Sequence, residues 1–363
     1  MKEIKLPMPG GTPGSQRVLQ AWEFGSSGPL AYLQAGLHAD ELPGVLALHR
    51  LRQHLMALEQ QGALLGRIRL VPQANPIGLS QWHFGLHQGR FLAATGQNFN
   101  RGYPLLVAKG EGEGEGEAIP THLTARDLLL ARLAERRPGG ELAWLQHTLF
   151  GWALEADLVL DIHCDSDALL HLYGHVRQRS QVERLGACLG AGVMLLSEQA
   201  GGMSFDDALL QNWYALMEGP QVPVAVTVEL RGQQDVADHL AEQDARRLLA
   251  CLVESGWIDP AFRMPAEPPT CTGGKATPLA AVEVISAPAA GILSYEVAPG
   301  DRVLAGQRVG WLTDAQTGER IALTAHHEGL CYARVLNRLA CAGDEVIFLA
   351  GEVAHREGDL LGL

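Results

Sequence analysis

Short apolar runs alternate with segments of helical periodicity from Arg17 to Ala250. The apolar runs are bounded by turn-forming residues and predict strands at residues 18–24, 30–35, 67–71, 158–162, 193–196 and 222–230. The periodic segments predict helices over residues 42–58, 124–135, 141–154, 205–217 and 235–254. This alternation predicts an α/β fold, with a mixed central sheet flanked by helices.

The start of the helix predicted over 205–217 is acidic. Ser204 precedes it, and Asp206 and Asp207 lie in its first turn. The helix dipole favours acidic side chains at this end, so the pattern is typical of a helix start.

The composition changes after Trp257. Prolines and glycines accumulate between residues 257 and 280, which predicts a linker. Short alternating strands follow, at 282–285, 291–297, 302–309 and 346–349, and the segment 287–297 is weakly repeated at 325–335. We therefore expect a catalytic domain over 1–256, a linker over 257–280 and an all-β barrel-sandwich domain over 281–363.

The β-region resembles biotinyl/lipoyl domains, through Ala290-Gly291-Ile292 and the Pro-Gly-Asp segment that ends at Asp301. Carrier domains of that kind need a lysine at a hairpin tip. The corresponding stretch, 313–319, has none, and the last lysine of the chain is Lys275. A carrier role is therefore not expected, and the region is better suited to a cap or an oligomer contact.

Charge and composition exclude several classes of protein. The net charge of −13 over 363 residues argues against a nucleic-acid partner, which would require excess Lys and Arg. No apolar run approaches the roughly 18 residues needed to cross a membrane. The N-terminus shows no secretory signal, so we expect a cytoplasmic protein without a membrane partner. A homo-oligomer is left open.

Two further segments have a mainly structural interpretation. The six cysteines include no Cys-x-x-Cys pair, which favours free thiols, and Cys164 is interpreted as a small buried residue at a strand end. The acidic Glu-Gly repeat at 110–118, within the segment 109–120, predicts a solvated surface loop.

Three residues offer the ligand types of a metal site. His38 and Glu41 are three positions apart where an apolar strand leads into a helix, and His163 ends another apolar strand. Two imidazoles and one carboxylate form the ligand set of a catalytic zinc ion, with a fourth position open to water. His-x-x-Glu occurs by chance in many proteins, so this spacing alone is a weak signal; together with the motifs and the resemblance described below, it leads us to expect one zinc ion per chain at this site.

Other polar residues complete the candidate chemistry. Asn100 and Arg101 supply an amide and a guanidinium, which together suit a substrate carboxylate. Glu229 ends the apolar strand 222–230, and a carboxylate in a pocket of low polarity beside a metal can serve as a general base.

This ordered set of motifs resembles the succinylglutamate desuccinylase/aspartoacylase family, whose members are relatives of the zinc carboxypeptidases. The motifs are Gly-x-His38-x-x-Glu41, Asn75-Pro76, Asn100-Arg101, Asp161-x-His163 and Thr227-Val-Glu229. The resemblance covers about residues 20–255.

The resemblance implies a role for each matching residue. His38, Glu41 and His163 would bind zinc, and Glu229 would move the proton between water and the leaving amine. Asn100 and Arg101 would hold a substrate carboxylate. The family also uses an arginine to polarise the scissile carbonyl, and Arg90 is the one arginine between Asn75 and Arg101.

Two segments depart from the family pattern. The first ligand pair is embedded in His38-Ala39-Asp40-Glu41 instead of His-Gly-Asn-Glu, and His163 is followed by Cys164-Asp165-Ser166-Asp167. The second difference lies near the expected pocket and leaves the substrate undefined.

We expect a zinc-dependent hydrolase of linear amide bonds that deacylates an N-acyl amino acid or a related small acylated amine. One alternative is a metallocarboxypeptidase that acts on peptide C-termini. Another is a catalytically silent protein that binds an acylated metabolite. Turnover of N-acyl amino acids but not of peptides would separate the first two, and loss of turnover on Glu229→Gln would argue against the third.

Overall fold

The structure is a computed structural model that describes residues 1–107, 124–261, 275–358 and 360–361. The predicted acidic loop at 110–118 lies outside these residues, as does the middle of the predicted linker. Within the described chain, no helix is both long and apolar enough to cross a membrane.

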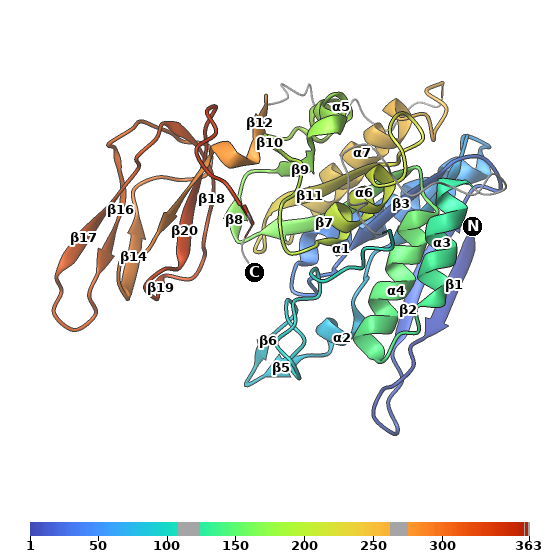
Figure 1. Cartoon of the computed structure of the whole chain (residues 1–363), viewed down its shortest axis with the longest axis horizontal. Helices are drawn as coiled ribbons and strands as arrows, with labels where there is room; N and C mark the ends of the chain where they lie inside the picture. Colours follow the sequence, from blue (N-terminus) through green and yellow to red (C-terminus); the bar gives the residue numbers. More distant parts are fainter. Residues whose placement is uncertain (108–123, 262–274, 359, 362–363) are drawn as a thin grey trace.

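A nine-stranded mixed sheet forms the centre of the larger, N-terminal part (Figure 1). Its strands, in spatial order, are β1 (Lys2–Pro7), β2 (Val18–Phe24), β4 (Arg67–Val71), β3 (Leu30–Ala35), β7 (Leu158–Asp165), β11 (Val224–Gly232), β9 (His171–His175), β10 (Val193–Ser197) and β12 (Ala276–Pro278). Strands β4, β3, β7 and β11 run parallel. β9 is antiparallel to β11, and β10 and β12 continue parallel to β9.

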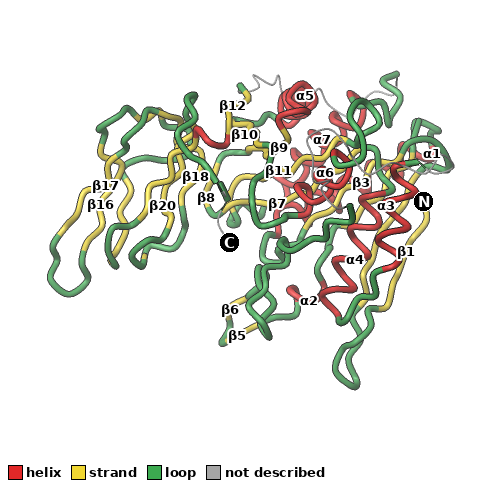
Figure 2. The backbone as a smooth tube through the Cα atoms, viewed as in Figure 1, coloured by secondary structure: helices red, strands yellow, loops and turns green. Residues whose placement is uncertain are grey.

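Helices cover both faces of this sheet (Figure 2). One face packs against α1 (Leu42–Gln60), α5 (Arg179–Leu189) and α7 (Asp238–Glu254). The other packs against α3 (Ala125–Glu135), α4 (Glu141–Leu154) and α6 (Phe205–Tyr214). Central strands buried on both faces are mostly apolar, which is why the sequence pattern predicted them. The predicted α/β fold with a mixed sheet is confirmed.

Short elements connect the layers. They are α2 (Pro76–Leu79), β5 (Trp82–His83), β6 (Leu86–His87), β8 (Asp167–Ala168) and the 3-10 turns Val176–Gln178 and Leu279–Ala281. The hydrophobic pattern did not predict β1 or β9, because β1 lies at the exposed edge of the sheet and β9 is rich in histidine and glycine.

The C-terminal part is all-β and forms two facing sheets. One contains β13 (Val282–Ser286), β20 (Glu345–Ala350), β18 (Gly329–Arg334) and β15 (Arg302–Val303). The other contains β17 (Arg320–Thr324), β16 (Arg308–Thr313), β14 (Gly291–Tyr295) and β19 (Leu339–Ala340). Apolar side chains from both sheets form one core. The described strands make a sandwich and do not close into a barrel.

The strand predicted over 302–309 is interrupted. The chain turns between β15 and β16, where Gly306 has a φ of 79° and the Gln307 N–H donates to the Leu304 carbonyl. The periodicity of the sequence runs through this turn because residues on either side both point into the sandwich core.

The two parts of the chain share hydrogen bonds and an apolar contact. β8, two residues beyond β7, pairs with β18 of the sandwich, and Arg334 on β18 binds Asp167 at 2.7 Å. A small core containing Leu195, Leu279 and Tyr332 lies at this contact. β12, which lies within the segment predicted as a linker, extends the large sheet.

Candidate functional site

The candidate metal ligands come from the ends of two neighbouring parallel strands. β3 ends at Ala35, beside Ile162 on β7, so the loop after β3 lies next to His163. Gly36 turns this loop with a φ of 66°, and an added Cβ would lie 2.2 Å from the Gln73 side-chain oxygen, so glycine is needed here. The carboxyl ends of parallel strands meet at one edge, which brings distant residues together.

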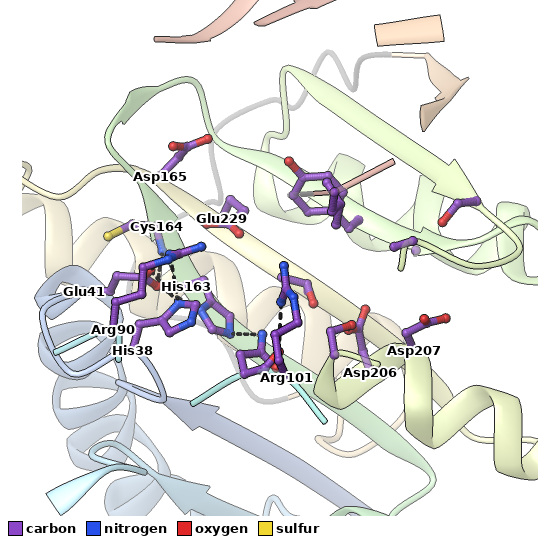
Figure 3. A pocket seen from close by; sticks show the side chains of 18 of the residues that line it. His38, Glu41, Arg90, Arg101, His163, Cys164, Asp165, Asp206, Asp207 and Glu229 are labelled. Carbon is purple, nitrogen blue, oxygen red and sulfur yellow. Dashed lines mark hydrogen bonds and ion pairs between the residues drawn. The ribbon is translucent and has the colours of Figure 1, made fainter. Parts of the chain in front are cut away.

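A tight turn orients the first two side chains. The Glu41 N–H donates to the His38 carbonyl at 3.1 Å, and Glu41 is the residue that precedes α1. Both side chains therefore point toward His163. The Glu41 carboxylate lies between the two imidazoles, 2.9 Å from His38 Nδ1 and 2.8 Å from His163 Nδ1 (Figure 3).

These three groups have the geometry of a metal site. One ligand atom from each of His38, Glu41 and His163 lies within 4.8 Å of the others, and all three residues are about 97% buried. In the described chain, no other group of His, Cys, Asp or Glu meets the same criterion.

The partner of His38 determines which of its ring nitrogens faces the site. The Asn100 backbone N–H donates to Asn98 Oδ1 at 2.8 Å, which identifies that side-chain atom as the oxygen. His38 Nε2 lies 2.9 Å from the same oxygen and must therefore carry a hydrogen. Its Nδ1 is left with a lone pair that faces Glu41.

His163 is held in the same way. Its Nε2 lies 3.1 Å from Asp161 Oδ2, and a carboxylate accepts hydrogen bonds, so Nε2 is again the protonated nitrogen. Gln34 fixes Asp161 through its other oxygen at 2.9 Å. Neutral histidine ligands are usually oriented by such partners. Both Nδ1 atoms are thus prepared to bind a cation.

The charges of the cluster also favour a cation. Burial raises the pKa of Glu41, but His38 and His163 outweigh burial and hold it well below the usual range. Burial lowers the pKa of His38. For His163, burial lowers the pKa, but Asp161 and Glu41 together raise it well above the usual range. Two carboxylates therefore hold a positive charge at His163, which a bound metal ion would replace.

Glu229 faces this cluster from the adjacent strand. It is paired in register with His163 across β11 and β7, and its side chain lines the same cavity (Figure 3). Burial raises the pKa of Glu229 well above the usual range; His163 acts in the opposite direction, and Glu41 adds to the rise. A carboxyl group in this setting is suited to taking up and releasing a proton.

Arg90 approaches the cluster from the loop before Asn98. Its Nη1 lies 3.2 Å from His38 Nδ1 and 3.3 Å from Glu41 Oε1, and its side chain is 40% exposed. The backbone beside it is tightly packed, because the Ala39 N–H donates to the Gly89 carbonyl at 3.0 Å. Arg90 thus places a cation at the edge of the candidate metal centre.

Asn100 and Arg101 both line the cavity, but they differ in how they are held. The Asn100 side-chain oxygen accepts a hydrogen bond from the Phe205 N–H at 2.9 Å, and its amide nitrogen lies 3.4 Å from His163 Nε2. Arg101 donates to the Asn100 carbonyl at 2.8 Å. Asn100 is therefore anchored to the start of α6, while the Arg101 guanidinium lies farther along the cavity wall (Figure 3).

The structure adds residues that sequence reasoning gave no role. Asn98 and Asp161 orient the two histidines, and Asp206 and Asp207 line the cavity. Glu345 and Phe348 on β20 of the sandwich and Leu361 near the C-terminus also line the cavity. The alternation in Asp161-Ile162-His163 places both polar side chains on one face of β7, a signal that was available in the sequence.

The segment that follows His163 has several local functions. The Cys164 N–H donates to Glu41 Oε2 at 3.2 Å, Asp165 lines the cavity, and Asp167 binds Arg334. Burial raises the pKa of the Cys164 thiol far above its ordinary value, so it stays protonated and is unsuited to act as a nucleophile.

The fold and the site together define an α/β protein with a buried group that could hold a metal ion. Residues 27–255 match the model of the succinylglutamate desuccinylase/aspartoacylase catalytic domain. The chain therefore belongs to the succinylglutamate desuccinylase/aspartoacylase family, a class of deacylases, and the predicted resemblance is confirmed.

Solved structures extend the likeness to almost the whole chain. A family protein of Shewanella amazonensis SB2B aligns with a TM-score of 0.79 at 25% identity, over 96% of this chain and 98% of its own. One from Shewanella frigidimarina NCIMB 400 aligns with a TM-score of 0.80 at 23% identity, over 96% and 97%.

A more distant likeness is to the product-bound ectoine utilization protein EutE (DoeB) from Ruegeria pomeroyi. Its TM-score is 0.69 at 18% identity, over 97% of this chain and 95% of that one. At this identity the likeness concerns the fold. Among curated proteins, no match to the chain was found.

Proposed function

We propose that this chain is a zinc-dependent amide hydrolase that deacylates an N-acyl amino acid or a related small acylated amine. The observation that carries the proposal is the pair of buried imidazoles whose Nδ1 atoms face Glu41, beside Glu229. This donor set fits zinc, which accepts His nitrogen and carboxylate oxygen and leaves a position open in catalytic sites. His38, Glu41 and His163 would hold the ion.

The zinc ion would supply a Lewis-acid charge that makes water a nucleophile near neutral pH. Glu229 accepts the proton of the attacking water and later delivers it to the leaving amine. The raised pKa of Glu229 supports both steps, because a carboxyl group with an increased affinity for the proton can hold it between them.

Two arginines would orient the substrate. Arg90, beside His38 and Glu41, would donate to the scissile carbonyl oxygen and stabilise the negative charge that develops on it. Arg101, farther along the cavity, would bind a substrate carboxylate. Asn100 would hold the cavity wall between the two arginines in place, because its side chain contacts both His163 and the start of α6.

The size of the cavity favours a small substrate. Its volume is about 230 Å³, below the roughly 300–1,000 Å³ typical of sites for drug-sized ligands. Glu345, Phe348 and Leu361 from the C-terminal part form one wall. A cavity bounded in this way supports a small acylated amine over a peptide C-terminus.

The test is amine release from N-acetyl, N-succinyl and N-formyl amino acids by the zinc-loaded protein, with dipeptides measured in parallel. We expect turnover of acyl amino acids and a loss of about 10²–10⁴-fold on Glu229→Gln, with zinc content unchanged. Glu319→Gln, at an exposed position, is the matched control. Turnover of peptides alone would favour a carboxypeptidase, and binding of acylated ligands without any turnover would favour a silent protein.

A further inference from the structure

Two acidic residues in the cavity wall have no role in the proposed hydrolysis. Asp206 and Asp207 lie in the first turn of α6 and both line the cavity, on the side where Arg101 lies (Figure 3). The helix dipole favours acidic side chains in the first turn of a helix whether or not a ligand is bound. Their position on α6 alone therefore does not indicate a ligand.

The contacts of Asp207 do indicate one. Its side chain is 92% buried; Gln211 and the backbone of Ala200 and Gly201 hydrogen-bond its carboxylate, but its Oδ2 atom has no hydrogen-bond partner among the described residues. A buried carboxylate oxygen without a partner is costly, and such groups are uncommon in folded proteins. The Oδ1 atom of Asp206 accepts a hydrogen bond from the Ser204 hydroxyl at 2.8 Å. An incoming hydrogen-bond donor would satisfy Asp207.

The charge around the pair identifies the donor as a cation. Burial raises the pKa of Asp206, and burial together with Asp206 raises the pKa of Asp207 to about 6. The positive charge of the neighbouring Arg101 therefore does not fully offset the negative charge of Asp206 and Asp207. Arg101 is itself confined, because an added Cβ on Gly202 would lie only 2.6 Å from its Cδ. One wall thus presents an under-compensated acidic pair beside a fixed guanidinium.

A metal ion is the less suitable cation for this pair. Among the described residues, the three-ligand geometry occurs at His38, Glu41 and His163 and not here. The guanidinium of Arg101 would also repel a divalent ion more strongly than it would a singly charged ammonium. An ammonium group can instead donate up to three hydrogen bonds to the two carboxylates.

We propose that Asp206 and Asp207 bind the α-ammonium group of the substrate while Arg101 binds its α-carboxylate. The negative charges of Asp206 and Asp207 lie beside the positive charge of Arg101. A free amino acid carries the complementary pair, an ammonium group and a carboxylate, on its α-carbon. The scissile amide then lies at the other end of the molecule, on the side-chain nitrogen. The substrate class is a diamino acid acylated on its side-chain nitrogen, a refinement that rests on the proposed deacylase function.

The test compares ligands that differ in one charge. Binding of L-ornithine, L-norvaline and L-glutamate to the zinc-loaded wild-type protein is measured by calorimetry. Turnover is measured on ornithine acetylated at its side-chain nitrogen or at its α-nitrogen. All three amino acids carry a free α-ammonium group. The decisive comparison is therefore between ornithine and 5-aminopentanoate, which lacks the α-ammonium group and is otherwise identical to ornithine.

We expect ornithine to bind about 10- to 100-fold more tightly than 5-aminopentanoate, as charge-assisted hydrogen bonds would give. The side-chain-acetylated isomer is expected to have the higher kcat/KM. Asp206→Asn with Asp207→Asn should abolish the binding preference, while Asp238→Asn, which removes an exposed charge on α7, should retain it. The wild-type ligand series is decisive even if the double variant does not fold.

The outcomes distinguish the two proposals. Equal binding of ornithine and 5-aminopentanoate, or faster turnover of the α-acetyl isomer, would overturn the assignment of the acidic pair; hydrolysis of other acyl amino acids would meanwhile leave the deacylase function standing. Selective ornithine binding without hydrolysis of any acylated amine would support the pair and refute the deacylase.

Discussion

His38 and Asn98 are 60 positions apart in the chain, and the 2.9 Å hydrogen bond between them determines which imidazole nitrogen faces the candidate metal centre. Asn98 can orient the ring because the Asn100 N–H fixes its side-chain oxygen toward His38. The relationship makes Asn98 a positioning residue for the metal ligand.

Replacing Asn98 should therefore weaken metal binding without removing a ligand. We expect Asn98→Ala to lower zinc affinity about 10- to 100-fold, the usual effect of losing a partner that orients a ligand. Competition with a chromophoric chelator measures this affinity, and Gln97→Ala at the exposed neighbouring position serves as the control. Equal affinities for both variants would show that the orientation of His38 does not depend on Asn98.

Removal of the metal should lower the thermal stability of the protein. Without a cation, the Glu41 carboxylate and the two imidazoles remain buried around an unfilled set of donors. Binding to the folded state alone adds about 4 kcal/mol when free metal is roughly 1,000 times its Kd. Calorimetry with a chelator and with restored zinc measures the shift in Tm.

Two histidine variants test where that stabilisation arises. The zinc-dependent shift should largely disappear in His38→Ala and persist in His355→Ala, whose residue is exposed on the C-terminal part. A shift that survived in His38→Ala would locate the stabilising ion elsewhere.

Gly89 should be essential for the position of Arg90. An added Cβ would lie 2.1 Å from the Asp40 nitrogen, too close for any side chain, so Gly89→Ala must displace the loop that carries Arg90. We expect kcat/KM to fall about 10²-fold or more, as for the loss of a group that stabilises the oxyanion. Gly139→Ala, where nothing lies within 4 Å, is the control and should have full activity. Equal kinetics for the two variants would contradict a role for this packing.

Asp207 should make stability depend on pH in a defined direction. Burial raises its pKa to about 6 in the folded chain, so the folded state binds this proton more tightly than the unfolded state does. The contribution of the group to stability is therefore present below about pH 4 and lost as pH rises through about 6.

The Asp207→Asn variant isolates this contribution. The free energy of unfolding of the variant minus that of wild type should increase by about 1–3 kcal/mol when the pH is raised from 4 to 7. Urea titrations at the two pH values measure the difference, and Asp238→Asn should show almost none because its side chain is 85% exposed. A difference that did not vary with pH would show that Asp207 is ionised at the same pH in both states.

Much of the central sheet could be predicted because its strands are buried on both faces. β3 is apolar except for Gln34, and β7 begins with the apolar run Leu158–Leu160 and continues with Ile162, a pattern typical of a strand between two layers of helices. β9 escaped prediction because its sequence is His-Leu-Tyr-Gly-His, and its antiparallel insertion between β11 and β10 follows from packing that no local pattern encodes.

The sequence by itself determined the apolar strands and the chemical identity of the proposed ligands, His38, Glu41 and His163. Local periodicity and residue chemistry are properties of neighbouring positions, so they can be recognised without a fold. Only the tertiary structure decided which nitrogens face the site and which acids share a wall with Arg101. Those relationships join residues far apart in the chain, and they exist because parallel strands end at one edge of the sheet and α6 begins beside it.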